Sequence, residues 1–212
     1  MSDISVIIRN RNEERYIGYA IQSVLDTFDK PEIIVVDNNS TDDSMKIVST
    51  FDFEDIKTYK IESYTPGKSL NYGVTKCSND YVLILSAHSQ ITKCNFDKIK
   101  MCLDGYCVVG GKQIPIWNGK KISKRYVWSH FIDKDDINQF SKSENRYFLH
   151  NAFAFYTKQT LTKYPFDENL SGKEDRYWVN DRIGDGMKSY YDSDSICHHH
   201  YTDNGATWKG IG

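Results

Sequence analysis

The sequence lacks a strong charge excess, an apolar run long enough to cross a membrane, and any sign of a cleaved leader. Its 27 Lys and Arg residues are balanced by 29 Asp and Glu residues, which leaves a net charge of -2. This balance argues against a dedicated nucleic-acid-binding protein, which would carry a basic face. No run approaches the ~18 apolar residues of a membrane span. Met1-Ser-Asp leads into an apolar segment without a basic flank, so we expect no signal peptide and a cytoplasmic location.

Paired cysteine motifs are also missing. The five cysteines form an odd-numbered set without a Cys-x-x-Cys spacing: Cys77, Cys94, Cys102, Cys107 and Cys197. We therefore expect reduced, mostly buried thiols in a cytosolic protein. A chain of 212 residues can bury about two thirds of its unfolded surface, so it needs no disulfides to be stable.

Internal repeats, low-complexity segments and linkers are absent, which predicts a single domain over residues 1–212. Within it, the apolar runs at residues 4–8, 33–36 and 81–85 carry no charge. Such runs are typical of strands buried on both faces of a parallel sheet. Polar loops and helically spaced apolar residues follow the first two runs. The alternation predicts an α/β, Rossmann-like fold with a mostly parallel central sheet flanked by helices.

Local signals set several boundaries. Asn12 is a suitable N-cap for the first helix, and a second helix should begin near Ser44. A third, shorter strand is predicted at residues 58–61. A turn at residues 64–69 and a short helix at residues 69–76 should lead into the strand at 81–85.

The second half is less regular. Its predicted elements are strands at residues 106–111, 151–156 and 195–201 and a helix from 174 to about 183. Residues 117–147 are polar and aromatic without clear periodicity, and this indicates an excursion from the sheet or a lid.

The strand at residues 81–85 stops abruptly at Ser86-Ala87-His88. In open α/β sheets, ligands bind just beyond the carboxyl ends of such strands. Ser86 and His88 are therefore the first candidates for a functional site, and the other polar loops at this edge should surround them.

Several segments of the sequence resemble the GT-A glycosyltransferases of family 2, inverting enzymes that use nucleotide-sugar donors. The similar segments are residues 4–14, Ile34-Val-Val-Asp-Asn-Asn-Ser-Thr-Asp42, Gly67-Lys-Ser-Leu-Asn-Tyr-Gly73, Val109-Gly-Gly111, Phe166-Asp-Glu168 and Glu174-Asp175. They occur in the family's order over nearly the whole length. The resemblance implies one GT-A domain with a nucleotide-binding half (residues 1–92) and an acceptor-binding half (residues 93–212).

The resemblance implies nucleotide contacts from Asn10, Glu14, Asp37, Asn39, Lys68 and Ser86. Asp37 ends a strand and would accept the imide N–H of uracil. Its other interpretation is the N-cap of the next helix, a position that Asp42 fits better. Lys68 would pair with the pyrophosphate, although an isolated lysine is by default solvated.

The catalytic base that the resemblance implies is Asp175. An inverting transferase needs one base beside the acceptor hydroxyl, and Glu174 would orient hydroxyls of the donor. Without the resemblance, two acids in a first helical turn are explained by the helix dipole. Arg176, Tyr177 and Trp178 would form a wall for the acceptor sugar, although Trp178 fits the core equally well.

One segment departs from the family pattern. The family normally carries Asp-x-Asp at the end of the central strand, where this sequence has Ser-Ala-His at residues 86–88. In the family, a divalent ion at that position stabilises the nucleoside diphosphate leaving group. An imidazole ligand suits Mn²⁺ better than Mg²⁺, so we expect Mn²⁺.

Two explanations of the departure stay open. In the related polypeptide N-acetylgalactosaminyltransferases, Asp-x-His is joined by a second histidine near the end of the domain. His88 would then pair with His200, or in second place with His198, because alternate residues of a strand share a face. The other explanation is transfer without a metal, in which Ser86, His88 and Lys68 stabilise the phosphates.

These observations predict an inverting glycosyltransferase that moves a sugar from a nucleotide-sugar donor to a hydroxyl of a glycan or lipid-linked glycan. A UDP-sugar is the donor that we favour. A catalytically inactive nucleotide-sugar-binding relative is the alternative. A nucleotidyltransferase is less favoured, because the loop at residues 9–14 has no glycine to approach phosphates. A lipid-linked acceptor would bring the protein to the inner face of the membrane as a peripheral enzyme.

Overall fold

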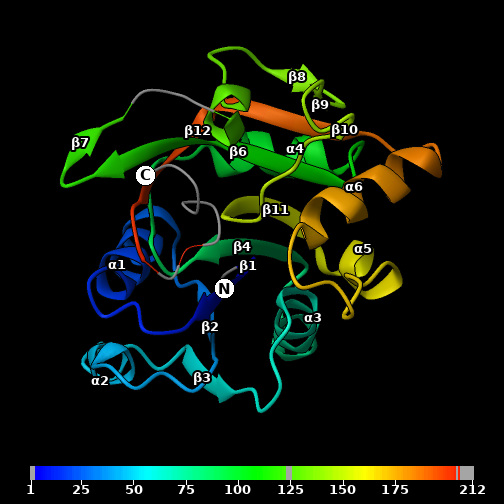
Figure 1. The fold of residues 1–212 in the computed structure, drawn as a ribbon. Helices are drawn as coiled ribbons and strands as arrows, with labels where there is room; N and C mark the ends of the chain where they lie inside the picture. Colours follow the sequence, from blue (N-terminus) through cyan, green and yellow to red (C-terminus); the bar gives the residue numbers. More distant parts are fainter. Residues whose placement is uncertain (1–2, 123–125, 204, 206–212) are drawn as a thin grey trace.

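The computed structural model describes residues 3–122, 126–203 and 205. Among these residues, ten strands form one sheet with the order β3-β2-β1-β4-β11-β6-β12-β5, and β7 and β8 pair with β6 and β12. Helices cover both faces of the sheet (Figure 1). The predicted α/β fold with a central sheet flanked by helices is therefore confirmed.

The first half of the sheet is parallel. Its strands are β3 (Ile56–Lys60), β2 (Glu32–Asp37), β1 (Ile4–Asn10) and β4 (Tyr81–Ser86). In β1, Val6 and Ile8 belong to one hydrophobic cluster and Ile7 to another on the opposite face. Burial on both faces explains why these strands are nearly continuous apolar runs. Because the strands are parallel, the polar loops that follow them meet at one edge of the sheet.

Beyond β4 the sheet is mixed. β11 (Phe153–Thr157) runs antiparallel to β4 and β6 (Val108–Trp117), and β12 (Ser189–His200) runs parallel to β6 and antiparallel to β5 (Ser89–Lys93). β6 and β12 both extend further than the sequence pattern predicts. β12 lies between β6, with which it pairs from Ser189 to His200, and β5, with which it pairs from Ile196 to His199, and its carboxyl end lies beside the loop that follows β4.

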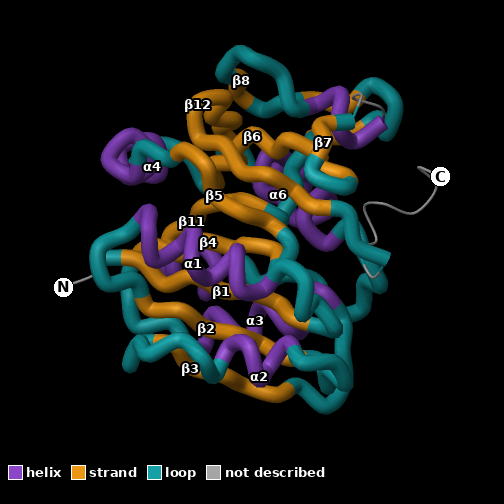
Figure 2. Tube along the Cα trace, turned by 90° about the vertical axis from the view of Figure 1, so that its left-hand side faces the viewer, coloured by secondary structure: helices purple, strands orange, loops and turns teal. Residues whose placement is uncertain are grey.

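The helices divide between the two faces. On one face lie α1 (Ile17–Thr27), α2 (Ser44–Val48) and α4 (Phe96–Leu103), and on the other lie α3 (Pro66–Lys76), α5 (Lys158–Lys163) and α6 (Glu174–Gly184). Figure 2 shows α1 and α2 in front of the strands, with α3 and α6 behind. Of the helices that the structure describes, none combines the length and apolar character needed to cross a membrane.

The segment predicted as an excursion contains short elements of its own. These are β7 (Lys120–Lys121), the 3-10 helix η1 (Tyr126–His130), β8 (Asp136–Ile137), β9 (Phe140–Ser141) and β10 (Arg146–Tyr147); residues 123–125 lie outside the described part. Trp128, Phe131 and Phe148 form a small hydrophobic cluster with Tyr191 of β12. The segment is thus attached to the sheet by its own core, and its role as a lid stays a prediction.

Two helix starts differ from the sequence prediction. Asn12 does not cap α1, which begins at Ile17; it adopts a left-handed conformation (φ 53°) and its side-chain oxygen accepts the N–H of Thr41 (2.8 Å). α3 begins at Pro66, within the predicted turn, because Thr65 caps it and proline suits the first helical position.

The start of α3 packs closely against the segment that precedes α6. A Cβ on Gly67 would lie 2.4 Å from the backbone oxygen of Asp167. The Asn71 side chain donates to the carbonyl of Phe166 (2.9 Å) and accepts its N–H (2.9 Å). Two segments of the family resemblance, far apart in sequence, are therefore in direct contact.

We expect Gly67→Ala to lower the free energy of unfolding by about 1–3 kcal/mol, because the methyl group meets backbone rather than a flexible side chain. Urea unfolding of the two proteins measures the difference. Gly105→Ala is the matched control, since an added Cβ there meets nothing within 4 Å. Equal stability of Gly67→Ala and wild type would show that the approach is not tight.

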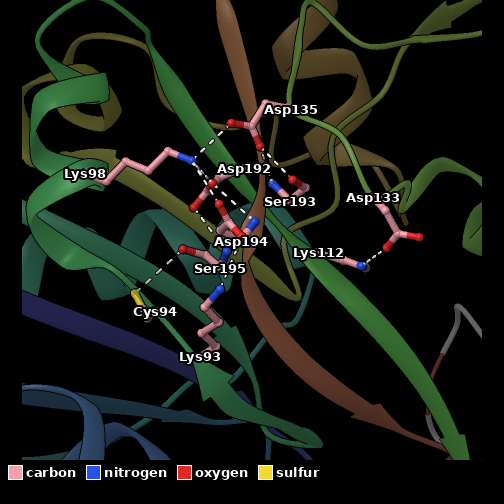
Figure 3. A network of polar contacts seen from close by, with 10 residues as sticks. All are labelled: Lys93, Cys94, Lys98, Lys112, Asp133, Asp135, Asp192, Ser193, Asp194 and Ser195. Atoms are coloured by element: carbon pink, nitrogen blue, oxygen red, sulfur yellow. Dashed lines mark hydrogen bonds and ion pairs between the residues drawn. The ribbon is translucent and has the colours of Figure 1, made fainter.

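A buried ionic network supports an irregularity in β12. The pairing of β12 with β6 shifts register between Asp192 and Ile196. The carboxylate of Asp192 is fully buried; it accepts the N–H of Ser195 (3.2 Å) and the amine of Lys98 (2.5 Å), which also contacts Asp135 (3.1 Å). Figure 3 shows these side chains converging from α4, β12 and the loop before β8. A bulge changes which residues of a strand point to a given face of the sheet. The irregularity that this network supports therefore affects which face the histidines further along β12 occupy.

Candidate functional site

Predicted nucleotide-binding side chains meet at the carboxyl ends of β1 and β2. Asn10 and Asp37 are register partners, and the Asn10 amide donates to Oδ1 of Asp37 (3.0 Å). Ser40 donates its hydroxyl to the same oxygen (2.5 Å) and its N–H to Oδ2 (3.1 Å). Asp37 is thus held at the strand end and does not cap α2. The predicted cap Asp42 is not at the N-cap position either, which Asp43 occupies, although Asp42 accepts the N–H of Ser44 (3.0 Å).

The other predicted nucleotide contacts lie around this pair. Glu14 is exposed and accepts a backbone N–H from the loop before α2 (2.9 Å). Asn39 adopts a left-handed conformation (φ 53°) in the loop after β2. Lys68 lies in the first turn of α3, and Ser86 ends β4 beside Arg9 of β1. Their contacts with a nucleotide stay predictions.

His88 faces His199, with 3.0 Å between the two Nε2 atoms. This contact is made by His199 and not by the predicted partners His200 and His198, whose role as metal ligands stays a prediction. Alternation along β12 does place these two together, on the opposite face of the strand from His199 (ring centroids 6.3 Å apart), and His200 stacks on Tyr16 (ring centroids 4.8 Å apart). The pattern does not reveal which face of β12 points inward, because a one-residue shift of register inverts both faces.

The remaining ring nitrogens of this pair also have partners. Nδ1 of His88 lies 3.1 Å from Oε1 of Glu13, and Nδ1 of His199 lies 2.9 Å from Oε1 of Gln113. Burial, together with the neighbouring histidines, lowers the pKa of His199 well below its ordinary value. A neutral imidazole such as that of His199 fits a cation that accepts nitrogen ligands. In the described part of the chain, no three His, Cys, Asp or Glu side chains converge as a complete metal site.

The two acids that open α6 face the same edge. Arg9, at the end of β1, donates to Oε1 of Glu174 (3.1 Å). Burial raises the pKa of Glu174, with a contribution from Asp175, although Arg9 opposes the shift. Oδ2 of Asp175 accepts the N–H of Asn151 (3.0 Å), and Oδ1 accepts that of Arg176 (2.8 Å). The chain thus brings the start of α6 against the end of β1.

The predicted acceptor wall is only partly on the surface. Trp178 is 3% exposed and donates its indole N–H to the carbonyl of Tyr164 (2.7 Å), so its prediction as a sugar-facing residue is wrong. Its position on α6 turns it toward the sheet, where it packs in the core. Arg176 is buried beside Glu144 (3.4 Å between Nε and Oε1), whereas Tyr177 is 46% exposed.

Comparison with known protein families identifies the family of this chain. Residues 5–164 match the model of "Glycosyl transferase family 2". The chain belongs to glycosyl transferase family 2. The fold agrees: a structure of S. aureus TarS 1-349 in complex with UDP-GlcNAc superposes with a TM-score of 0.74 at 21% identity, covering 98% of this chain and 61% of TarS. The protein therefore has a GT-A fold.

Two curated relatives match most of this family 2 chain. It is 27% identical over 188 residues to the GalNAc(5)-diNAcBac-PP-undecaprenol beta-1,3-glucosyltransferase of Campylobacter jejuni, covering 85% of this chain and 60% of the relative. It is 25% identical over 190 residues to the minor teichoic acid biosynthesis protein GgaA of Bacillus subtilis, covering 83% and 42%. The chain thus spans less than two thirds of the length of these relatives.

The sequence did not single out several residues that contact the predicted residues of this candidate site. Arg9 and Glu13 lie in a loop that the resemblance covers, but in sequence neither differs from its charged neighbours. Gln113 follows a predicted strand end, and His199 is one of three consecutive histidines. Only the tertiary contacts distinguish Glu13 from Glu14 and His199 from His200.

Proposed function

We propose that the protein is an inverting glycosyltransferase that moves a sugar from a nucleotide donor to a hydroxyl of a glycan or lipid-linked glycan. The observation that carries the proposal is the Arg9–Glu174 contact (3.1 Å), which brings the acids of α6 to the edge where the nucleotide side chains lie. Membership of family 2 supports the reaction type. The inactive relative is less favoured, because both acids of α6 are present and buried beside this edge.

The nucleotide would bind at the ends of β1 and β2. Asp37 would accept the imide N–H of uracil, with its carboxylate oriented by Asn10 and Ser40. A cavity of about 420 Å³ beside Asp37, with mostly apolar walls that include Phe51 and Phe53, supports a base at this position. The TarS complex with UDP-GlcNAc supports UDP as the nucleotide. Glu14, Asn39, Lys68 and Ser86 would complete the contacts to ribose and phosphates.

The transfer step would use Asp175 as the base. As the acceptor oxygen attacks the anomeric carbon, its proton passes to the Asp175 carboxylate. The new glycosidic bond forms while the bond from the anomeric carbon to the diphosphate oxygen breaks, so the configuration inverts. Glu174, oriented by Arg9, would hold donor hydroxyls during the attack.

The leaving diphosphate needs positive charge or hydrogen-bond donors. A divalent cation, when bound, neutralises the charge that develops on it. We propose Mn²⁺ rather than Mg²⁺, because His88 offers nitrogen where the family carries a carboxylate. Without a cation, Ser86, His88 and Lys68 would have to stabilise the phosphates alone.

The acceptor would bind on the side formed by residues 93–212, near Asp175 and the exposed Tyr177. The Campylobacter relative is named for an undecaprenol-linked substrate. A similar acceptor for this chain would place the reaction at the cytoplasmic face of a membrane.

The test of the function is UDP release from a panel of UDP-sugars in the presence of Mn²⁺ and candidate acceptors. Release with at least one donor supports the transferase. Binding of UDP without release from any donor would favour the inactive relative, and no nucleotide binding with or without metal would overturn both.

We expect Asp37→Asn to weaken UDP binding about 10- to 100-fold, because the uracil N–H loses a charged acceptor. Isothermal titration of UDP measures the loss. Asp43→Asn, a change of an exposed acid in the following loop, should leave the affinity unchanged. Undiminished UDP affinity of Asp37→Asn would remove Asp37 from the base-binding role.

A further inference from the structure

We propose that Arg146 and Lys173 bind a phosphate group of the acceptor, beside the hydroxyl from which Asp175 would take the proton. The inference rests on the proposed function, because it names the charge of the acceptor in that reaction. The observations concern three cations between the hairpin of β9 and β10 and the first turn of α6, here called the hairpin cluster: Arg146, Lys173 and Arg176.

The hairpin is fixed against α6 by hydrogen bonds of Asn180. Oδ1 of Asn180 accepts the N–H of Tyr147 (3.2 Å), and Nδ2 donates to the Tyr147 carbonyl (3.3 Å). Nδ2 also donates to the carbonyl of Arg176 within α6 (2.6 Å). Figure 1 shows β10 beside this helix. The side chains of the hairpin therefore have a defined position over the start of α6, where Asp175 lies.

More cations than carboxylates meet in the hairpin cluster. Nε of Arg146 and Nζ of Lys173 each lie 3.8 Å from Oε2 of Glu144. Arg176 lies deeper, with Nε 3.4 Å from Oε1 of Glu144 and Nη1 3.9 Å from Oδ1 of Asp175. Among the ion pairs of the described residues, three cations thus share two carboxylates, and every distance exceeds the about 2.8 Å of a charge-assisted hydrogen bond. The cluster therefore attracts a further anion.

Two of the three cations can reach a ligand. The side chains of Arg146 and Lys173 are 25% and 47% exposed, whereas Arg176 is buried and adds its charge from below. Nε of Arg146 donates to the carbonyl of Glu144 (3.3 Å), but its Nη1 has no hydrogen-bond partner among the described residues. The guanidinium of Arg146 is therefore only partly engaged by the fold.

Two further features fit a sugar that carries the charge. The guanidinium of Arg146 lies over the half-exposed ring of Tyr177 (4.9 Å from Cζ to the ring centroid). Aromatic rings pack on the C–H surfaces of sugars, so this contact places a cation beside a sugar-binding group. Lys173 adopts a left-handed conformation (φ 60°), which glycine adopts at lower cost. Strained positions of this kind are concentrated at binding sites.

A phosphate suits the cluster better than a carboxylate does. It has three oxygens that accept hydrogen bonds, so it can contact the fork of Arg146 and the amine of Lys173 at the same time. A phosphate within a glycan and a phosphate that joins a glycan to a lipid both present this group. In either case the cluster would orient the acceptor through a group next to the reacting hydroxyl.

The experiment compares glucose 6-phosphate, glucuronic acid and glucose, which differ only at carbon 6, by ligand-observed NMR titration of the full chain. UDP and Mn²⁺ are present at saturation, so that the phosphate does not enter the nucleotide site. We expect glucose 6-phosphate to bind at least ten-fold more tightly than glucose, with glucuronic acid between them. Arg146→Gln and Lys173→Gln should each weaken the binding of glucose 6-phosphate at least five-fold, with glucose and UDP unaffected.

Lys163→Gln is the matched control, because it removes an exposed lysine from α5; its affinities should equal those of wild type. Thermal unfolding checks that each variant folds, and Lys173→Gln, at the more exposed position, decides the matter if Arg146→Gln does not fold. Equal affinity of wild type for glucose 6-phosphate and glucose would overturn the proposal. Equal affinity for glucose 6-phosphate and glucuronic acid would overturn the choice of phosphate.

Two further measurements separate this proposal from its neighbours. Cosedimentation with phosphatidylglycerol vesicles should be the same for wild type and both variants; a loss confined to the variants, with unchanged binding of glucose 6-phosphate, would assign the cluster to membrane lipid and overturn an acceptor subsite. UDP titration and UDP release from the donor alone do not involve the cluster. They report whether the proposed function fails, independently of whether glucose 6-phosphate binds.

Discussion

Asp175→Asn should lower the rate of sugar transfer by about 10²- to 10⁴-fold, the contribution of a positioned general base. Asparagine has the same shape and can still accept the N–H of Asn151, which now donates to Oδ2 of Asp175 at 3.0 Å. It cannot take a proton from the acceptor hydroxyl. The loss should therefore appear in turnover, while the affinity for UDP stays the same.

The measurement is initial UDP release with the donor and acceptor identified in the panel, together with UDP titration of the same preparations. Asp181→Asn is the matched control, because it makes the same change at an exposed position of the same helix. Transfer by Asp175→Asn at the wild-type rate would exclude Asp175 as the base. A parallel loss of UDP binding would instead indicate a structural role.

Lys98→Met should lower the free energy of unfolding by about 3 kcal/mol, because it leaves a buried charge on Asp192 without its counterion. Asp192 is 0% exposed, and Lys98 contacts it at 2.5 Å. We expect the lower end of the range for broken buried ion pairs, since Lys98 is partly exposed and Asp192 keeps the N–H of Ser195.

Urea unfolding measures this effect, and Lys100→Met on the same helix is the control. Lys100 pairs with an exposed acid, Asp97, so its loss should change stability by no more than about 0.5 kcal/mol. The double variant Lys98→Met/Asp192→Asn should recover part of the loss, because the stranded charge is gone. If Lys98→Met were no less stable than the control, the network would not contribute to the stability of the fold.

The two experiments address different parts of the site. The first concerns α6 and the chemistry, and the second concerns the irregularity in β12 that precedes His199.

The sequence by itself determined the fold class, the family and the edge of the sheet where the site lies. Uncharged apolar runs such as residues 33–36 are local patterns, and a strand buried on both faces needs no distant information to be recognised. The order of parallel strands then requires the following loops to meet at one edge. The acids Glu174 and Asp175 were identified through the family resemblance, by their place at the start of a predicted helix.

Only the tertiary structure decided which neighbouring side chain points into the site. His199 rather than His200 faces His88, Glu13 rather than Glu14 contacts it, and Trp178 turns into the core. Strand register and helix rotation set these directions, and both depend on contacts between segments far apart in the chain. At residues 198–200 the three side chains are identical, so a shift of one position leaves the local pattern unchanged while it inverts the face of the strand.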